Sequence, residues 1–122
     1  KSVELKENED GTFDIFIPTL SFKINSSELL KTEKNENTLN QVYNILVDEQ
    51  YEDYKVIITG YVNPDGKQWT KEEINLALQR AKSVEKYLIE LGVNKNRLES
   101  KAGSGKTENK EYNRRVEFSL KK

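Results

Sequence analysis

The segment from Thr70 to Gly92 constrains the fold more than any other part of this 122-residue chain. Apolar side chains recur along it at the 3.6-residue spacing of an α-helix, so one helix face must be buried against another element. Thr70 and Glu73 have the spacing of a capping box, which marks the start of the helix. Gly92 is typical of a C-terminal cap, which marks its end. The apolar face comprises Ile74, Ala77, Leu78, Ala81, Val84, Leu88 and Leu91.

A central strand is predicted before this helix. Residues 54–60 are rich in β-branched side chains, and the consecutive apolar residues 56–58 indicate burial on both faces. The sequence Asn63-Pro64-Asp65-Gly66 then predicts a turn. Two further strands are expected after the helix, at residues 97–102 and 115–120, around a polar connection rich in Gly.

The first half of the chain predicts a hairpin and a second helix. Residues 3–6 and 12–17 alternate in polarity around a turn sequence, which indicates a hairpin or two short strands. Residues 20–24 indicate another short strand or an extended connection. From about residue 32 to residue 49, Leu39, Val42, Tyr43 and Leu46 fall at helical spacing.

The order β-α-β-α-β-β predicts an α/β (α+β) fold, a two-layer sandwich with the helices packed on one face of a mixed β-sheet. The length suits one domain. We therefore expect residues 1–122 to form a single domain, with 13–120 as its core and 1–12 as an N-terminal extension or hairpin strand.

Missing residue types exclude several functions. The chain has no His and no Cys, which rules out His-based acid–base catalysis, Cys-His nucleophiles, disulfides and thiolate metal sites. Its 20 Lys and Arg are interleaved with 21 Asp and Glu, whereas a nucleic-acid binder carries a basic stripe. The sequence Gly103-Ser104-Gly105-Lys106-Thr107 lacks the first Gly and the following helix of a phosphate-binding loop. We expect no enzymatic activity, no cofactor or metal, and no nucleic-acid partner.

Membrane attachment, if any, is expected through a segment outside this chain. No run of about 18 apolar residues and no signal-peptide core is present in the sequence. The chain also contains no Met, so we expect it to be a fragment of a longer protein.

An ordered series of segments extends over about residues 13–120. These segments are Leu20-Ser21-Phe22, Ser27-Glu28-Leu29, residues 56–66, residues 76–81 with Val84 and Leu88, Gly92-Val93, Arg97-Leu98, Gly103-Ser104-Gly105 and Asn113-Arg114-Arg115-Val116-Glu117. Taken in this order, they resemble the OmpA-like C-terminal domain family. The resemblance implies a periplasmic domain that holds the cell wall non-covalently by clasping the diamino acid of the peptidoglycan stem peptide.

Arg80 matches the Arg of the family's binding site, and a guanidinium fork suits the carboxylate of a diamino acid. The positions one helical turn away carry no carboxylate, so Arg80 is not neutralised within its own helix. We expect it at the shoulder of the apolar stripe, where it can reach a cleft. The alternative is an Arg80 that pairs with a carboxylate from another element. The neighbouring positions are Leu76, Ala77, Ser83 and Val84.

The loop after the central strand departs from the family. Where the family has Gly-His-Thr-Asp, this chain has Gly60-Tyr61-Val62-Asn63, so an amide replaces the carboxylate that would bind an ammonium. Asn63 can still accept a hydrogen bond, but a charge-assisted bond is roughly twice as strong as a neutral one. Asp65 could supply the missing charge if the loop turns it inward.

Three more residues complete the predicted site. Tyr61 lies on the loop that should wall the site, where its ring could contact the ligand. Asn113 and Arg114 match the family's Asn-Arg-Arg sequence before the last strand, although exposed cations that protect a strand edge explain Arg114 equally well. The predicted cleft therefore lies between residues 60–66, Arg80 and residues 113–114.

Two functions remain open. In the first, the chain binds peptidoglycan, in weakened form, and anchors an envelope protein to the wall. In the second, it is a degenerate domain that has lost peptidoglycan binding and serves as a structural or protein-interaction module with envelope protein partners. Retention of Arg80 favours the first, and Asn63 favours the second. Both imply a location in the periplasm or cell envelope, with outer-membrane association through a missing N-terminal part.

Overall fold

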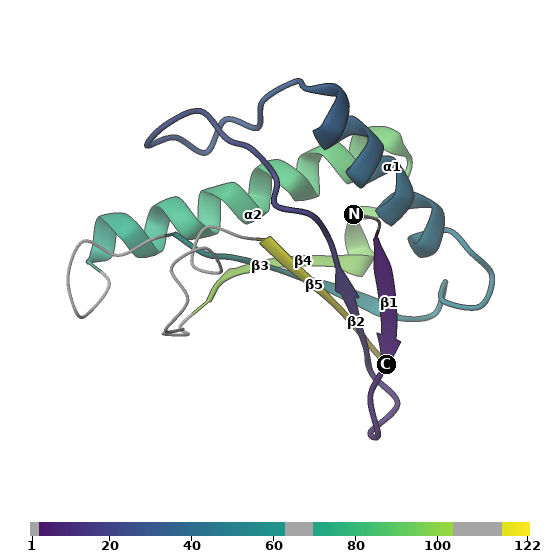
Figure 1. The fold of residues 1–122 in the computed structure, drawn as a ribbon. Helices are drawn as coiled ribbons and strands as arrows, with labels where there is room; N and C mark the ends of the chain where they lie inside the picture. Colours follow the sequence, from purple (N-terminus) through teal and green to yellow (C-terminus); the bar gives the residue numbers. More distant parts are fainter. Residues whose placement is uncertain (1–2, 63–69, 104–115) are drawn as a thin grey trace.

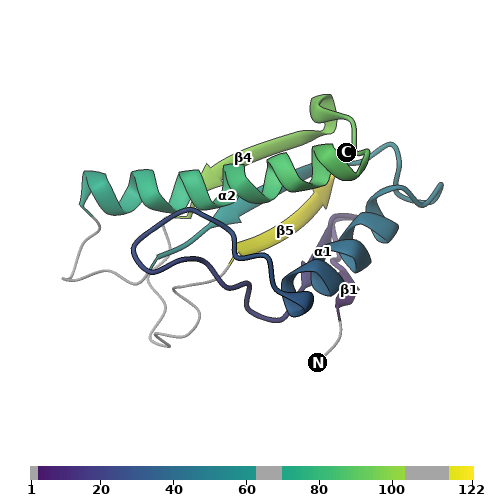
Figure 2. The ribbon, with the colours of Figure 1, turned by 90° about the horizontal axis from the view of Figure 1, so that it is seen from above.

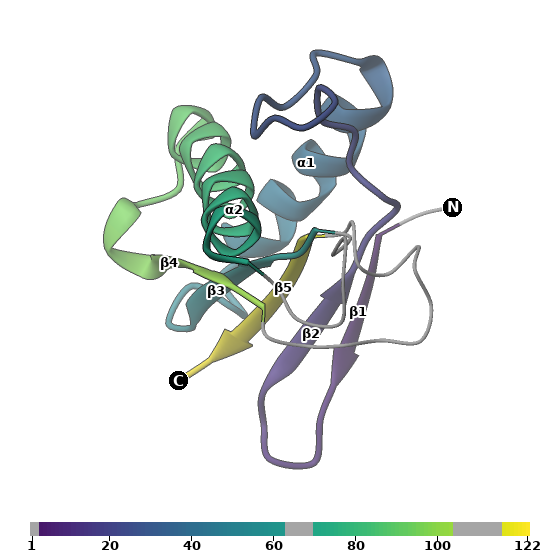
Figure 3. The same ribbon diagram turned by 90° about the vertical axis from the view of Figure 1, so that its left-hand side faces the viewer.

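The computed structural model describes residues 3–62, 70–103 and 116–122. Within these ranges, five strands form one sheet in the order β1-β2-β5-β3-β4, and the two α-helices lie on the same face of it (Figures 1 and 3). β3 and β4 are parallel, and the other neighbours are antiparallel. The predicted two-layer sandwich on a mixed sheet is therefore confirmed. Along the chain the elements are β1 (Glu4–Glu7), β2 (Phe13–Phe16), α1 (Glu33–Leu46), β3 (Lys55–Gly60), α2 (Lys71–Leu91), the 3-10 turn η1 (Lys95–Arg97), β4 (Leu98–Ala102) and β5 (Val116–Lys121).

The predicted limits of α2 are confirmed. The Thr70 hydroxyl accepts from the backbone of Glu73, whose side chain accepts from the backbone of Thr70, so the capping box is complete. Gly92 follows the last helical residue with φ of 125°, which favours glycine.

Other elements differ from prediction at their ends. α1 is shorter than residues 32–49, because Thr32 is its N-cap and the residues after Val47 turn back toward the sheet. β4 begins at Leu98 because Arg97 closes η1, and β5 spans 116–121. Residues 20–24 form the extended connection, with a single bridge between Phe22 and Leu29. Residues 4–7 and 13–16 pair as the expected antiparallel hairpin.

The core lies between the sheet and the two helices. β3 is an interior strand between β5 and the edge strand β4, and not the central strand that the sequence predicted. The predicted burial on both faces is confirmed, because Val56 and Ile58 are fully buried beneath the helices and Ile57 is 8% exposed on the other face. The remaining fully buried large side chains come from both helices and from β5. They are Asn35, Leu39, Val42, Leu46, Val84, Leu88, Phe118 and Leu120.

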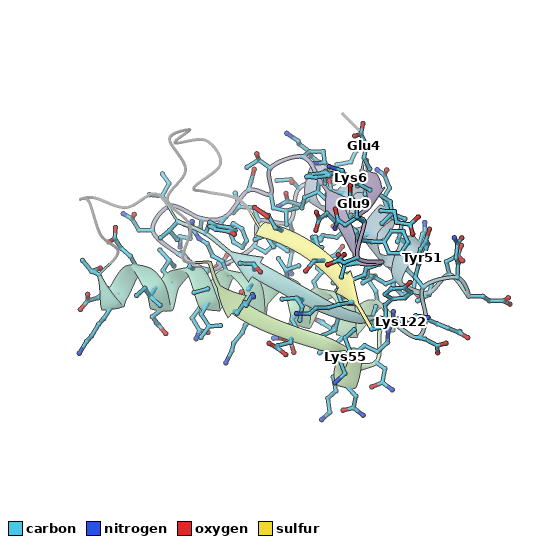
Figure 4. The ribbon with its side chains drawn as sticks, turned by 90° about the horizontal axis from the view of Figure 1, so that it is seen from below. Glu4, Lys6, Glu9, Tyr51, Lys55 and Lys122 are labelled. Carbon is cyan, nitrogen blue, oxygen red and sulfur yellow. The ribbon has the colours of Figure 1, made fainter. Side chains whose placement is uncertain are left out.

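No helix in the described ranges covers the opposite face of the sheet, onto which Figure 4 looks. Side chains alternate between the two faces of each strand, so the residues next to buried ones point to this open face. Most of them are polar or charged, as in Lys6, Lys55, Glu99 and Lys101, while Ile57 and the 52% exposed Phe16 are apolar. Among the described helices, none is long and apolar enough to cross a membrane.

Arg97 holds the connection between α1 and β3 in place. Its guanidinium donates to three backbone carbonyls, those of Leu46 at 2.6 Å, Tyr51 at 2.8 Å and Tyr54 at 3.1 Å. Burial lowers the pKa of Arg97, against the raising effect of Glu52 and Asp53. The side chain therefore stabilises the C-terminal end of α1, where backbone carbonyls lack helical partners.

Candidate functional site

The candidate site begins where the parallel strands β3 and β4 end at the same edge of the sheet (Figure 1). The N–H of Gly103 donates to the Gly60 carbonyl at 2.8 Å, which extends the pairing of the two strands by one step. Tyr61 and Gly103, which directly follow the two strands, are therefore brought together.

Gly60 allows the end of β3 to lie directly beneath α2. A Cβ atom at this position would lie 3.0 Å from the carbonyl carbon of Ala77, closer still to its oxygen, and 3.2 Å from the backbone nitrogen of Ala81. Both alanines are fully buried, so small residues are used on each side of the contact. This packing fixes the end of the strand relative to the helix that carries Arg80.

Tyr61 packs against Gly103. A Cβ at Gly103 would collide with the Tyr61 ring, since it would lie 2.7 Å from Cδ2 and nearer to two other ring atoms. Gly103 is buried and Tyr61 is half-buried, while the next residue, Val62, is 3% exposed. The Tyr61 ring thus packs against the residue that follows β4, while the side chain of Val62 is buried.

Arg80 lies half-buried on α2 and contacts the segment 20–30 from the N-terminal half of the chain. Its Nε donates to the carbonyl of Ser26 at 2.9 Å, and its Cζ lies 5.1 Å from the centre of the Phe22 ring. Cation–π contact at such a distance is favourable. One turn further along α2, the Ser83 hydroxyl lies 2.7 Å from the Ser27 carbonyl and 3.1 Å from that of Gln79.

The segment 20–30 is itself held by Asn35 of α1. The Asn35 side chain, 2% exposed, accepts from the N–H of Ser21 at 3.0 Å and donates to the carbonyls of Ser21 and Leu30. Backbone bonds from Lys23 to Glu28 and from Leu30 to Ser21 close the segment into a loop. The loop that touches Arg80 is therefore anchored at both ends.

The structure describes two of the predicted site residues: Arg80, on α2, contacts segment 20–30, and Tyr61, directly after β3, packs against Gly103. The contacts of Arg80 with Ser26 and Phe22 were missed by the sequence analysis, because they join residues more than 50 positions apart. The polar side chain of Ser83, one helical turn from Arg80, was the one local sign that another segment contacts this part of α2. The other predicted site residues, Asn63, Asp65, Asn113 and Arg114, lie outside the described residues.

Comparisons with known proteins place this geometry in a wider group. The family model described as the OmpA family matches residues 21–117. No curated protein matches the chain. An outer membrane protein from Borrelia burgdorferi B31 is 24% identical, with a TM-score of 0.74 over 99% of this chain and 98% of that one.

Two further solved structures share the fold at lower identity. The periplasmic domain of Helicobacter pylori MotB is 18% identical, with a TM-score of 0.73 over 99% of this chain and 80% of that one. The peptidoglycan-associated lipoprotein from Burkholderia pseudomallei is 19% identical, with a TM-score of 0.60 over 83% of this chain and 86% of that one. At these identities the likeness is one of fold.

Proposed function

The chain belongs to the OmpA family, and we propose that it is a non-catalytic module that binds the peptidoglycan stem peptide and anchors an envelope protein to the cell wall. The ligand is the diamino acid of that peptide, which carries an ammonium and a carboxylate. Arg80 binds the carboxylate, because a guanidinium offers paired donors in the geometry that a carboxylate accepts.

The orientation of Arg80 is the observation that carries this proposal. The bond from Nε to the Ser26 carbonyl and the contact with the Phe22 ring restrict the side chain on two sides. A side chain restricted in this way loses less conformational entropy when it binds a ligand. The anchoring of segment 20–30 by Asn35 and Ser83 extends this preorganisation to both helices.

The ammonium of the diamino acid is assigned to Asn63 or Asp65, and its aliphatic stem to the ring of Tyr61. The position of Tyr61, packed on Gly103 at the end of β3, supports a wall at this side of the site. Asn113 and Arg114, which precede β5 in the sequence, complete the proposed site. With an amide at position 63, we expect weaker binding than a carboxylate would give.

The second candidate is a domain that keeps the fold and has abandoned peptidoglycan for protein partners in the envelope. Asn63 favours it, since the family has a carboxylate there. Both candidates share a proposed location in the periplasm or cell envelope with attachment through a segment outside this chain. Two structural neighbours, an outer membrane protein and a peptidoglycan-associated lipoprotein, support that location.

Co-sedimentation with purified insoluble peptidoglycan separates the two candidates. We expect the native chain to bind, Arg80→Ala to lose about tenfold or more in affinity, and Asn63→Asp to gain affinity. Lys86→Ala is the matched control, because Lys86 is an exposed cation on the same helix. Thermal unfolding of each variant shows whether a loss of binding is a loss of fold.

The outcomes are distinct. Binding that survives Arg80→Ala unchanged removes Arg80 from the site. A native chain that does not bind, while Asn63→Asp binds, supports the second candidate. Binding that falls equally in Arg80→Ala and Lys86→Ala indicates a general charge effect and contradicts a specific site.

A further inference from the structure

β4 is one edge of the sheet, and within the described ranges no strand pairs with its outer side (Figure 3). An exposed edge strand offers unpaired backbone groups to another chain unless the protein protects it. The opposite edge, β1, carries charged side chains at Glu4, Lys6 and Glu7. The charged residues of β4, Glu99 and Lys101, are of opposite sign and lie on either side of Ser100.

In β4, alternate residues direct their backbone N–H and C=O groups outward, away from β3. The N–H of Gly103 bonds to the Gly60 carbonyl on β3, so Lys101 and Glu99, at two-residue steps, also direct their backbone groups to β3. Ser100 and Ala102 therefore direct N–H and C=O away from the sheet. Leu98 directs its C=O outward, while its N–H donates to the Lys95 carbonyl in η1.

The sequence of β4, Leu98-Glu99-Ser100-Lys101-Ala102, is complementary to itself in antiparallel order. If a two-fold axis passes beside Ser100, Glu99 of each copy lies opposite Lys101 of the other. Both side chains are exposed and lie on the open face of the sheet. In this register the outward groups also match: Ser100 pairs with Ser100, and the Ala102 N–H meets the Leu98 carbonyl.

The helix above this edge shows an independent feature. The Ser100 hydroxyl donates to Glu85 of α2 at 2.5 Å, so the Glu85 side of the helix overlies β4. At about 100° per residue, Ile74, Leu78 and Ile89 lie within about 40° of Glu85 around the helix. Ile74 is 45% exposed and Ile89 is 37% exposed. Large apolar side chains thus follow the side of α2 that borders the free edge.

The spacing of the layers allows both features to be used together. α2 packs on β3 and β4 (Figure 2). Two copies joined edge to edge therefore place their α2 helices about two strand spacings apart, roughly 10 Å, which is a normal distance between packed helices. The apolar side chains of one α2 then meet those of the other.

We propose that a second copy of this chain occupies the β4 edge, through an antiparallel β4–β4 pair that continues the sheet and through contact between the two α2 helices. The interface is isologous, so each contact occurs twice. It is small, and it brings the two Glu85 carboxylates near the axis, where they repel each other. The dimer is therefore weak and forms at high local concentration.

Sedimentation velocity of the 122-residue chain over a range of concentrations tests the proposal. We expect a reversible monomer–dimer equilibrium. Lys101→Glu should raise the dissociation constant about tenfold, since it places like charges opposite each other twice. The double variant Glu99→Lys/Lys101→Glu restores opposite charges and should restore association. Glu85→Gln should tighten it.

Lys6→Glu is the matched control, because Lys6 is an exposed cation on the other edge strand. Equal effects of Lys6→Glu and Lys101→Glu would overturn the proposed edge, and so would a double variant that stays as weak as Lys101→Glu. A chain that remains monomeric up to about 1 mM would overturn the dimer and leave the edge to a different partner.

Amide hydrogen exchange provides a readout at the bonds themselves. The N–H groups of Ser100 and Ala102 should become protected as concentration rises, while those of β1 should not change. The Arg80→Ala variant should dimerise normally, so this proposal and the proposed wall binding can fail separately.

Discussion

The hydroxyl of Ser83 lies 2.7 Å from the carbonyl of Ser27, one helical turn from the point where Arg80 donates to Ser26. Two adjacent carbonyls of one loop are thus held by two side chains of α2. Ser83 does not need to contact a ligand to affect Arg80, because it holds the loop to which Arg80 donates its hydrogen bond. We therefore regard Ser83 as a positioning residue.

Ser83→Ala should lower peptidoglycan affinity several-fold and reduce the free energy of unfolding by about 1 kcal/mol, as expected for one lost hydrogen bond. Ser83→Thr keeps the hydroxyl and should recover most of the affinity. Ser119→Ala on the open face serves as control. If Ser83→Ala lowers stability while wall affinity stays at the native level, Ser83 is structural only.

Gly103→Ala should destabilise the chain by about 1–3 kcal/mol, because its methyl group would collide with the Tyr61 ring. The cost should fall when Tyr61→Ala removes the ring, so a double-mutant cycle measured by urea unfolding tests the contact. Additive effects in the cycle would show that the two residues do not meet in solution.

Arg97→Ala should cost about 2–3 kcal/mol, since three carbonyls lose a charged donor. Wall binding at a temperature well below the unfolding midpoint should be unchanged, because Arg97 lies at the other end of β3 from Gly60. Arg97→Lys should recover part of the stability, as a single ammonium cannot reach all three carbonyls. Thermal unfolding should therefore show the native chain as the most stable, Arg97→Lys as intermediate and Arg97→Ala as the least stable.

Local sequence signals predicted most of the fold because they act within one element. The capping box at Thr70, the β-branched residues around Ile57 and the alternation of the first hairpin each specify a helix start, a strand or a turn without help from distant residues. The observed ends of elements differ from the predicted ones where a residue contacts a distant part of the chain. Arg97 was expected in a strand, yet it forms a 3-10 turn whose side chain caps the end of α1.

The candidate site was predictable only in part for the same reason. Arg80 stood out because the positions one helical turn away carry no carboxylate, and that signal is local. Its contacts with Ser26 and Phe22 depend on how segment 20–30 folds back over α2, which in turn depends on Asn35. A buried Asn inside a polar helical segment carries no periodic signal, so neither the loop nor its role could be read from the sequence.

Asp10 predicts a dependence of stability on acid pH. The Thr12 hydroxyl donates to its carboxylate at 2.6 Å and the Thr12 N–H at 3.0 Å, and these bonds lower the pKa of Asp10 below its ordinary value of about 4. A carboxyl with a lowered folded-state pKa stabilises the fold above its ordinary pKa, and this stabilisation disappears as pH falls through the folded-state value. The native chain should therefore be more stable than Asp10→Asn near neutral pH.

Between about pH 5 and pH 2 the difference in stability between the two chains should close, because the unfolded chain binds the proton first. Urea unfolding of both chains at several pH values measures this difference directly, and a gap that stays constant down to about pH 2 would contradict the assignment.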